Sequence, residues 1–303
     1  MEVFGEFYGS LLPYLLFIPL GFWIGKKQWL TKNWITGPLI YVLMPVLVIN
    51  HVLKADEVKL TLLPIMAFLL AAAMVIPAKL CHHYISRSDD PLILKSAFSY
   101  FNVAFFGIPI VTALFGAEMV TTLICIYLGT ALYGNTVGFY QIAKSKYSAQ
   151  KAIFKVLKIP FLYIFLLALV LKIWGAETPK PLAPLVDVIS VVVSAGGMMM
   201  VGMNVVKVDF TGIDKRYFIK TLSFRTTSAL LIVTLLIALE YVFMDDLDPK
   251  DRNILLLVAL FPVAANLTVY ASFLGSKEEA SALIVLLTMG LSLILVPLAA
   301  MWF

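Results

Sequence analysis

Charged residues are scarce in this chain: Asp, Glu, Lys and Arg together make up 14% of its 303 residues. A water-soluble domain of this length carries charge at about one residue in four. The chain also lacks a phosphate-binding Walker sequence, an HExxH sequence and the nucleophile elbow of a hydrolase. These absences exclude a soluble globular domain and disfavour an ATP-driven pump or an intramembrane hydrolase, so we expect no enzymatic activity.

Metal ligands and redox groups are equally few. The two cysteines, Cys81 and Cys125, both fall within long apolar runs, which favours buried thiols over a disulfide. His82 and His83 are adjacent and therefore do not share a helix face. We expect no metal site and no cofactor. The net charge of +5 contains no basic cluster dense enough to indicate nucleic-acid binding.

Hydrophobic residues, in contrast, make up 61% of the chain and give it a mean hydropathy of +0.96. Apolar runs of about 20 residues recur throughout, and each can cross about 30 Å of hydrocarbon as a helix. The sequence therefore predicts an all-α polytopic membrane protein embedded in a lipid bilayer. Ten spans are predicted, at residues 9–26, 34–53, 60–82, 94–115, 119–140, 154–175, 184–206, 218–243, 252–273 and 280–302.

Lys and Arg residues are distributed unevenly between the connections of these ten spans. With the amino terminus outside, 17 of the 23 basic residues fall in inside-facing connections. Cytoplasmic loops of membrane proteins carry an excess of basic residues. The distribution therefore predicts ten spans with both termini outside, in the plasma membrane or, in a bacterium, the inner membrane.

Two stretches resemble membrane helices that are broken in the middle, Ser99–Gly116 and Ala259–Gly275. Each places Pro, Asn and small residues at the centre of an apolar run and ends on Phe and Leu followed by Gly. The two final glycines are 159 residues apart, about half the chain. This spacing predicts two five-helix repeats, residues 1–147 and 148–303, with the broken spans 4 and 9 at matching positions. Because five is odd, the second repeat is inverted, an arrangement common in secondary transporters.

A broken membrane helix is a candidate binding site, because unpaired backbone groups are tolerated at membrane depth only inside protein or against a watery cavity. Pro109 and Pro262 each lack an amide hydrogen and interrupt helical hydrogen bonding, and Gly107 allows another backbone to approach closely. Asn102 and Asn266 can bond the freed backbone groups or a polar solute. Two resumed half-helices would aim the positive ends of their dipoles at the mid-plane, so backbone amides would hold an anion there.

Two further asparagines are candidates for contact with the solute, Asn135 in span 5 and Asn50 late in span 2. For Asn135, a polar contact between helices is an equally good interpretation. Ionisable residues within spans are functional candidates by default. We expect Glu240 to pair nearby or reach water, and His51 to form an interfacial hydrogen bond. Arg225 is expected to reach the cytoplasmic interface, with contact to an anion as the alternative.

The residues at the first break, Asn-Val-Ala-Phe-Phe-Gly-Ile-Pro at 102–109, resemble the Asn-Thr-Gly-Phe-x-Gly-x-Pro signature of bacterial members of the auxin efflux carrier family. The segment from Pro262 through Leu274-Gly275 to Glu278-Glu279-Ala280-Ser281 is similar to that family's ninth span and the start of its tenth. Length, span number and outside termini also fit, so the resemblance covers essentially the whole chain. Positions 103 and 104 carry Val and Ala where the family has Thr and Gly, which removes one hydroxyl group and some backbone freedom.

The resemblance implies secondary active transport of a small organic anion by an elevator-like movement. Spans 1, 2, 6 and 7 would form a scaffold and a homodimer interface. Spans 3–5 and 8–10 would form the moving transport domain, with the two broken helices crossing inside it. Plant relatives carry the indole carboxylate auxin, whereas bacterial relatives are regarded as carriers of carboxylates such as malate or malonate.

Two alternatives stay open, a sodium-coupled symporter of the bile-acid type and a membrane sensor that binds solute without moving it. A Na⁺ site needs clustered oxygen ligands at the mid-plane, and the spans contain no such acidic cluster. Proton-coupled or uncoupled transport is therefore preferred. A sensor would be favoured by a long soluble output domain, and the sequence contains none.

Overall fold

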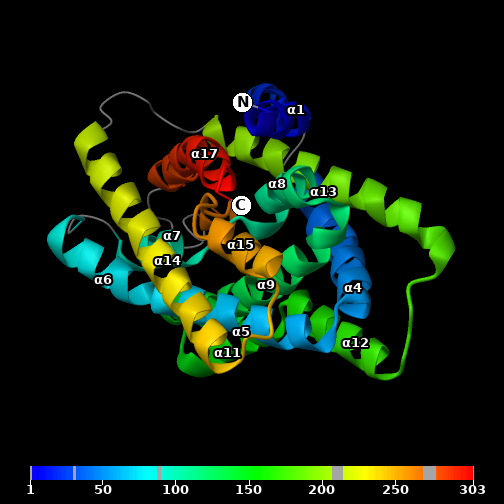
Figure 1. Cartoon of the computed structure of the whole chain (residues 1–303). Coiled ribbons are helices and arrows are strands. Elements are labelled where there is room, and N and C mark those ends of the chain that lie inside the picture. Colours follow the sequence, from blue (N-terminus) through cyan, green and yellow to red (C-terminus); the bar gives the residue numbers. More distant parts are fainter. Residues whose placement is uncertain (1, 30–31, 87–89, 207–213, 269–277, 303) are drawn as a thin grey trace.

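The computed structural model describes residues 2–29, 32–86, 90–206, 214–268 and 278–302. Nearly all of this part of the chain is helical (Figure 1), which confirms the all-α class. Within the described ranges, the one strand-like pairing is an isolated antiparallel bridge between Phe101 and Val263. The segment 269–277, which contains Gly275 and part of the predicted broken span 9, lies outside the described residues.

Five helical stretches are long and apolar enough to cross a membrane, and a sixth qualifies if two helices bent by 49° form one span. They coincide with predicted spans 3, 5, 7, 8 and 10, and the bent pair coincides with span 6. Their elements are α5 (Glu57–Ala73) with α6 (Val75–Tyr84); η2 (Ala117–Met119), α9 (Val120–Tyr133), η3 (Gly134–Gly138) and α10 (Phe139–Lys144); η4 (Lys180–Leu182) with α13 (Ala183–Val205); α14 (Lys215–Phe243); α17 (Glu278–Ala300); and the bent pair α11 (Ala149–Leu157) and α12 (Pro160–Ile173).

The other four predicted spans consist of shorter helices. Span 1 corresponds to α1 (Glu2–Leu15) and α2 (Phe17–Lys27), and span 2 to α3 (Lys32–Pro38), the π-helix η1 (Leu39–Leu43) and α4 (Met44–Lys54). Span 4 corresponds to α7 (Pro91–Ser99) and α8 (Val103–Phe115), and span 9 begins with α15 (Pro249–Val258). Ten spans and the inverted repeat therefore stay predictions, while a membrane protein with five or six long apolar helices is compatible with the fold.

Several helices begin where a short polar side chain caps the free amides of the first turn. Asp56 accepts a hydrogen bond from the Lys59 amide at the start of α5, at 2.7 Å. Asp90 accepts from the Leu92 amide at the start of α7, at 2.8 Å, and is followed by a proline. Such caps contribute about 1 kcal/mol each. Each of these two caps fixes the residue at which its helix begins.

Small residues set the closest helix contacts inside the molecule. A Cβ at Gly202 of α13 would collide with the backbone carbonyl of Ile18 in α2, and one at Gly21 of α2 would collide with that of Met199. Such residues let membrane helices pack backbone to backbone. α13 therefore lies directly against α2, while α5 packs along α9 in the same way.

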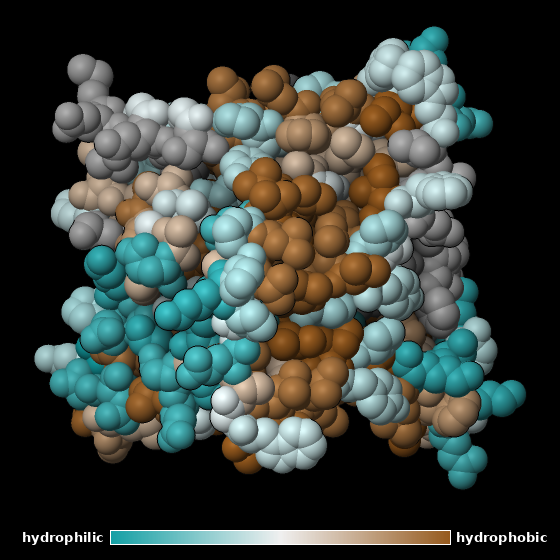
Figure 2. Space-filling view, turned by 90° about the vertical axis from the view of Figure 1, so that its right-hand side faces the viewer, coloured by the Kyte–Doolittle hydropathy of each residue, from teal (hydrophilic) through white to brown (hydrophobic). Residues whose placement is uncertain are grey.

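A broad apolar band covers the side of the molecule on which α4, α12 and α13 lie (Figure 2). On α12 the exposed residues are Leu166, Leu167, Val170 and Ile173, and on α13 they are Leu185, Val188, Val191 and Val192. Apolar side chains on this scale are unfavourable in water and favourable against acyl chains. The band is compatible with a protein that sits in a bilayer.

Candidate functional site

The candidate site lies where two unwound stretches of backbone meet. The first is Tyr100–Asn102, between the end of α7 and the start of α8. The second follows α15, where the chain is non-helical over 259–265 before a helical turn begins at Asn266. The two stretches are 160 residues apart in sequence, and they run antiparallel with a bridge between Phe101 and Val263.

Backbone hydrogen bonds join these two stretches directly. The Asn102 amide donates to the Pro262 carbonyl at 2.8 Å, and the Ala264 amide donates to the Tyr100 carbonyl at 3.2 Å. In an apolar surrounding each unpaired backbone group would cost several kcal/mol. Mutual pairing therefore stabilises both interruptions.

Pro109 does not interrupt the helix, so the prediction that it breaks span 4 is wrong. It lies inside α8, which continues to Phe115, and the break falls earlier, at Tyr100–Asn102. A proline removes only one helical hydrogen bond, and α8 absorbs that loss. Gly107 also lies inside α8 and packs against side chains rather than another backbone. A Cβ there would lie 2.7 Å from the Phe261 ring and 3.1 Å from Leu123.

A buried arginine holds the crossing together from α14. Arg225 is 2% exposed, and its Nε donates to the Ala97 carbonyl at 2.8 Å. Its Nη1 and Nη2 donate to the carbonyls of Phe261 and Tyr100 at 3.3 and 3.5 Å, and its Cζ lies 4.7 Å from the centre of the Phe101 ring. The expectation that Arg225 reaches the cytoplasmic interface is wrong, because the broken helix offers buried carbonyls that need donors.

Two hydroxyl groups of α17 complete the support of the second stretch. The Thr288 Oγ1 accepts from the Val263 amide at 3.1 Å, and the Ser292 Oγ donates to the Leu260 carbonyl at 2.6 Å. Sequence reasoning missed both residues. The available signal was a Thr and a Ser four positions apart in an apolar helix, which places both hydroxyls on one face.

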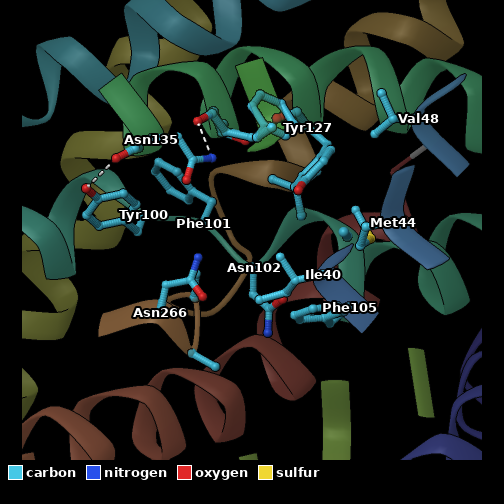
Figure 3. Close-up of a pocket in the computed structure, with 18 of the residues that line it drawn as sticks. Ile40, Met44, Val48, Tyr100, Phe101, Asn102, Phe105, Tyr127, Asn135 and Asn266 are labelled. Atoms are coloured by element: carbon cyan, nitrogen blue, oxygen red, sulfur yellow. Dashed lines mark hydrogen bonds between the residues drawn. The ribbon is translucent and has the colours of Figure 1, made fainter. Parts of the chain in front are cut away.

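Beside the crossing lies a cavity of about 150 Å³ (Figure 3). An apolar cavity of about this volume can hold an aromatic ring. Its wall is formed by η1 and α4, the start of α8, α9 with η3, the start of α12, and the stretch 264–266. The apolar lining includes Ile40, Met44, Val48, Phe101, Phe105 and Phe161, and the polar lining consists of Tyr100, Asn102, Tyr127, Thr130, Asn135 and Asn266.

Three of the seven residues predicted from sequence line this cavity: Asn102, Asn135 and Asn266. The Nδ2 of Asn102 is buried and has no hydrogen-bond partner among the residues that the structure describes. Asn135 donates from Nδ2 to the Ala131 carbonyl at 2.9 Å, within the wide π-helical turn η3. Turns of this type are frequent at functional sites. The Asn135 side chain therefore bonds to the preceding helical turn and also lines the cavity.

The other four predicted residues do not line the cavity. Gly107 and Pro109 lie in α8, and Pro262 supplies a carbonyl to the crossing. Asn50 lies in α4 and is 4% exposed, and within the described part of the chain neither of its side-chain polar atoms has a hydrogen-bond partner.

Two ionisable residues form polar contacts away from the cavity. His51 follows the cavity-lining part of α4, and its Nδ1 lies 3.0 Å from Thr121 Oγ1 of α9. Glu240 pairs with Arg252, whose Nε and Nη2 donate to its carboxylate at 2.8 and 3.2 Å. That pair joins the end of α14 to the start of α15.

The electrostatic character of the cavity comes from backbone groups at its wall and from the Arg225 guanidinium behind Tyr100 and Phe101. None of the described residues that line it has a charged side chain. α8 begins at Val103 next to the cavity, and the side chain of its N-cap, Asn102, makes no capping bond. The first amides of a helix have no partner within the helix and carry about half a positive charge. The Val103 amide donates to the Phe101 carbonyl at 2.9 Å, and the amino end of α8 places the positive end of its helix dipole beside a cavity with largely apolar walls.

In the part of the chain that the structure describes, no three His, Cys, Asp or Glu side chains gather to hold a metal ion. No family model and no curated protein sequence matches this chain.

Proposed function

We infer that this chain is a secondary transporter that moves a small organic anion across a membrane by alternating access. The observation that carries the inference is the cavity beside the crossing of two unwound segments, at the amino end of α8. Helix amino ends bind anions through free amides and the helix dipole. In transporters, unwound helices near the mid-plane are where substrates bind.

The lining favours one class of organic anion. The rings of Phe101, Phe105, Tyr127 and Phe161 and several aliphatic side chains line the cavity together with a few polar side chains. A substrate with an apolar, aromatic body and a single carboxylate suits such a mixed lining. A dicarboxylate of the malate type would place its second charge against apolar walls, with no cation among the described lining residues, and burying an unpaired charge is unfavourable. We therefore favour an aromatic monocarboxylate over a dicarboxylate.

The position of the cavity supports an elevator-like movement. α4 and α12, from the proposed scaffold spans 2 and 6, form one side of it. α8, α9 and the stretch 264–266, from the proposed transport domain, form the other side. A substrate held there lies between two groups of helices that could slide past each other. The proposal retains ten spans, both termini outside the plasma membrane, and a homodimer formed through the scaffold helices.

The experiment is uptake into proteoliposomes. We expect radiolabelled indole-acetate to accumulate faster than malate or malonate under an imposed pH gradient, with sodium gradients as a parallel arm. Asn102→Asp places a negative charge at the cavity and should reduce uptake more than tenfold, because a like charge opposes the anion. Asn253→Ala, in α15 away from the cavity lining, is the matched control and should leave uptake unchanged.

Three outcomes would overturn parts of the proposal. If no carboxylate crosses under any gradient although binding is measurable, the chain is a sensor. If uptake needs sodium, the sodium-coupled alternative replaces the preferred mechanism. If Asn102→Asp transports as the parent protein does, the cavity beside the crossing is not the substrate site.

A further inference from the structure

A second, more open groove lies on another part of the surface, between α6, α7 and α10. Its volume is about 420 Å³, and it shares no lining residue with the cavity beside the crossing. Three lysines line it, Lys79 of α6, Lys95 of α7 and Lys144 of α10. No acidic residue is among the described residues that line it.

The three ammonium groups have no acidic partner within the described ranges. The ion pairs found there involve Lys59 and Arg252, and none involves Lys79, Lys95 or Lys144. Lys144 instead lies over the ring of Tyr140, with its Nζ 5.9 Å from the ring centre. Three like charges around one groove repel one another, and an anion placed between them relieves that repulsion.

The groove is not purely polar, and its apolar part identifies the kind of anion. Val75 and Leu92 form part of its wall. Beside it, α6 exposes Ile76 and Leu80, with 65% and 45% of their surfaces accessible. Residues 57–84 form one of the helical stretches long and apolar enough to span a membrane. A ligand in this groove thus meets cations at one end and a lipid-facing helix surface along its length.

The neighbouring helix α11 has the composition of a helix that lies in the membrane interface. It exposes Ile153, Phe154 and Leu157 while carrying Lys151 and Lys155. It packs against α10 and is bent by 49° from α12. Between residues 141 and 160 there are five lysines and no acidic residue. Basic helices with one exposed apolar face bind at the headgroup level of anionic membranes.

We propose that the groove between α6, α7 and α10 binds the phosphate of an anionic phospholipid. Lys79, Lys95 and Lys144 hold the phosphate, and the acyl chains lie along the exposed apolar face of α6. α11 beside it fixes the depth of this region in the headgroup layer. In the proposed topology, the connection between α6 and α7 and the connection that follows α10 both face the cytoplasm. The cytoplasmic leaflet is rich in anionic lipid. The inference requires a bilayer but does not depend on transport activity.

The test is lipid-dependent thermal stability of the full chain in detergent. Ligands that bind only the folded state raise its apparent unfolding temperature. We expect phosphatidylglycerol to raise it in a saturable manner, while phosphatidylcholine with the same acyl chains, or inorganic phosphate alone, does not. Because each basic residue near an anionic surface strengthens binding about fivefold, the triple variant K79Q/K95Q/K144Q should need about 100-fold more phosphatidylglycerol for the same shift.

The matched control is K54Q/K180Q/K250Q, which removes three exposed lysines outside the groove. It should respond to phosphatidylglycerol as the parent chain does. If the groove variant is too unstable to measure, the charge-preserving K79R/K95R/K144R must keep the response while the single K144Q weakens it. An undiminished response in the lysine-to-glutamine groove variants, an equal loss of response in K54Q/K180Q/K250Q, or equal shifts with phosphatidylcholine or phosphate would overturn the proposal.

Discussion

Replacing Arg225 by methionine tests the electrostatic part of the proposed site most directly. The guanidinium is buried and bonds to the carbonyls of Ala97, Tyr100 and Phe261. It does not line the cavity, but Tyr100 and Phe101, which it contacts, both do. Its positive charge therefore lies one residue behind the cavity wall, and methionine removes the charge while keeping most of the volume.

The size of the effect on anion binding follows from Coulomb's law. A unit charge about 8 Å from a bound carboxylate, at an effective dielectric constant of about 20, contributes about 2 kcal/mol. Loss of that attraction weakens binding of a carboxylate about 30-fold. A neutral ligand of the same shape lacks the charge, so its affinity should change much less. Arg225→Lys keeps the charge and should weaken binding of the carboxylate only a few-fold, through poorer bonding to the three carbonyls.

Two terms that oppose each other decide the stability of the ligand-free variant. Arg225→Met leaves the Ala97 and Phe261 carbonyls without this donor, at about 1–3 kcal/mol each. The Tyr100 carbonyl still accepts from the Ala264 amide. Removing a buried charge that has no acidic partner returns several kcal/mol of desolvation free energy. We therefore expect a net loss of less than about 3 kcal/mol, which leaves a folded protein to assay.

The assay is titration with indole-acetate and, in parallel, with its neutral amide. Lys220→Gln, which removes an exposed charge from the same helix, is the control and should bind both ligands normally. The reasoning fails if Arg225→Met binds indole-acetate as tightly as the parent chain. It also fails if the amide loses affinity to the same extent, because the effect would then be one of shape.

Two further predictions concern packing and ion pairing, and both are checked by unfolding temperature in detergent. Gly107→Ala should destabilise the protein by about 1–3 kcal/mol, because the new Cβ would lie 2.7 Å from the Phe261 ring. The control is Gly290→Ala, where a Cβ would meet no described atom within 4 Å, and it should be neutral or stabilising by up to about 1 kcal/mol. An equal loss of stability at both sites would contradict the packing argument. Arg252→Gln should cost about 1–3 kcal/mol, because the Glu240 carboxylate loses its charged partner and keeps only the amides of Asp246 and Leu247. Adding Glu240→Gln should restore part of that loss, whereas an additive loss would refute pairing.

The sequence was sufficient for the features that depend on local composition. Long apolar runs predicted the helical class and coincide with the long helices of spans 3, 5, 7, 8 and 10. Asparagines in apolar runs pointed to Asn102, Asn135 and Asn266, and the structure brings these three to one cavity. An asparagine in such a run needs polar partners, but the same signal also pointed to Asn50, which does not line the cavity.

The features that sequence reasoning missed depend on partners far away in the chain. The break in span 4 falls at Tyr100–Asn102 rather than at Pro109, because Pro262 and Ala264 supply the hydrogen bonds that an unwound segment needs. No local pattern encodes a partner 160 residues away. The position of Arg225 was missed because its partners are also distant in sequence. A lone charge in an apolar run suggests a residue that reaches the membrane interface, and only the fold shows the buried carbonyls that it bonds.

The placement of Arg225 has a consequence for a transporter that must release what it binds. A cation in direct contact with a carboxylate, inside apolar walls, forms a pair that is costly to separate without water. In the proposed site the carboxylate meets backbone amides and Asn102, while the arginine is occupied with three carbonyls behind the wall. Such an arrangement adds long-range attraction without a contact ion pair. For the proposed transport we therefore expect moderate affinity and fast release, with Arg225 also holding the two unwound segments together.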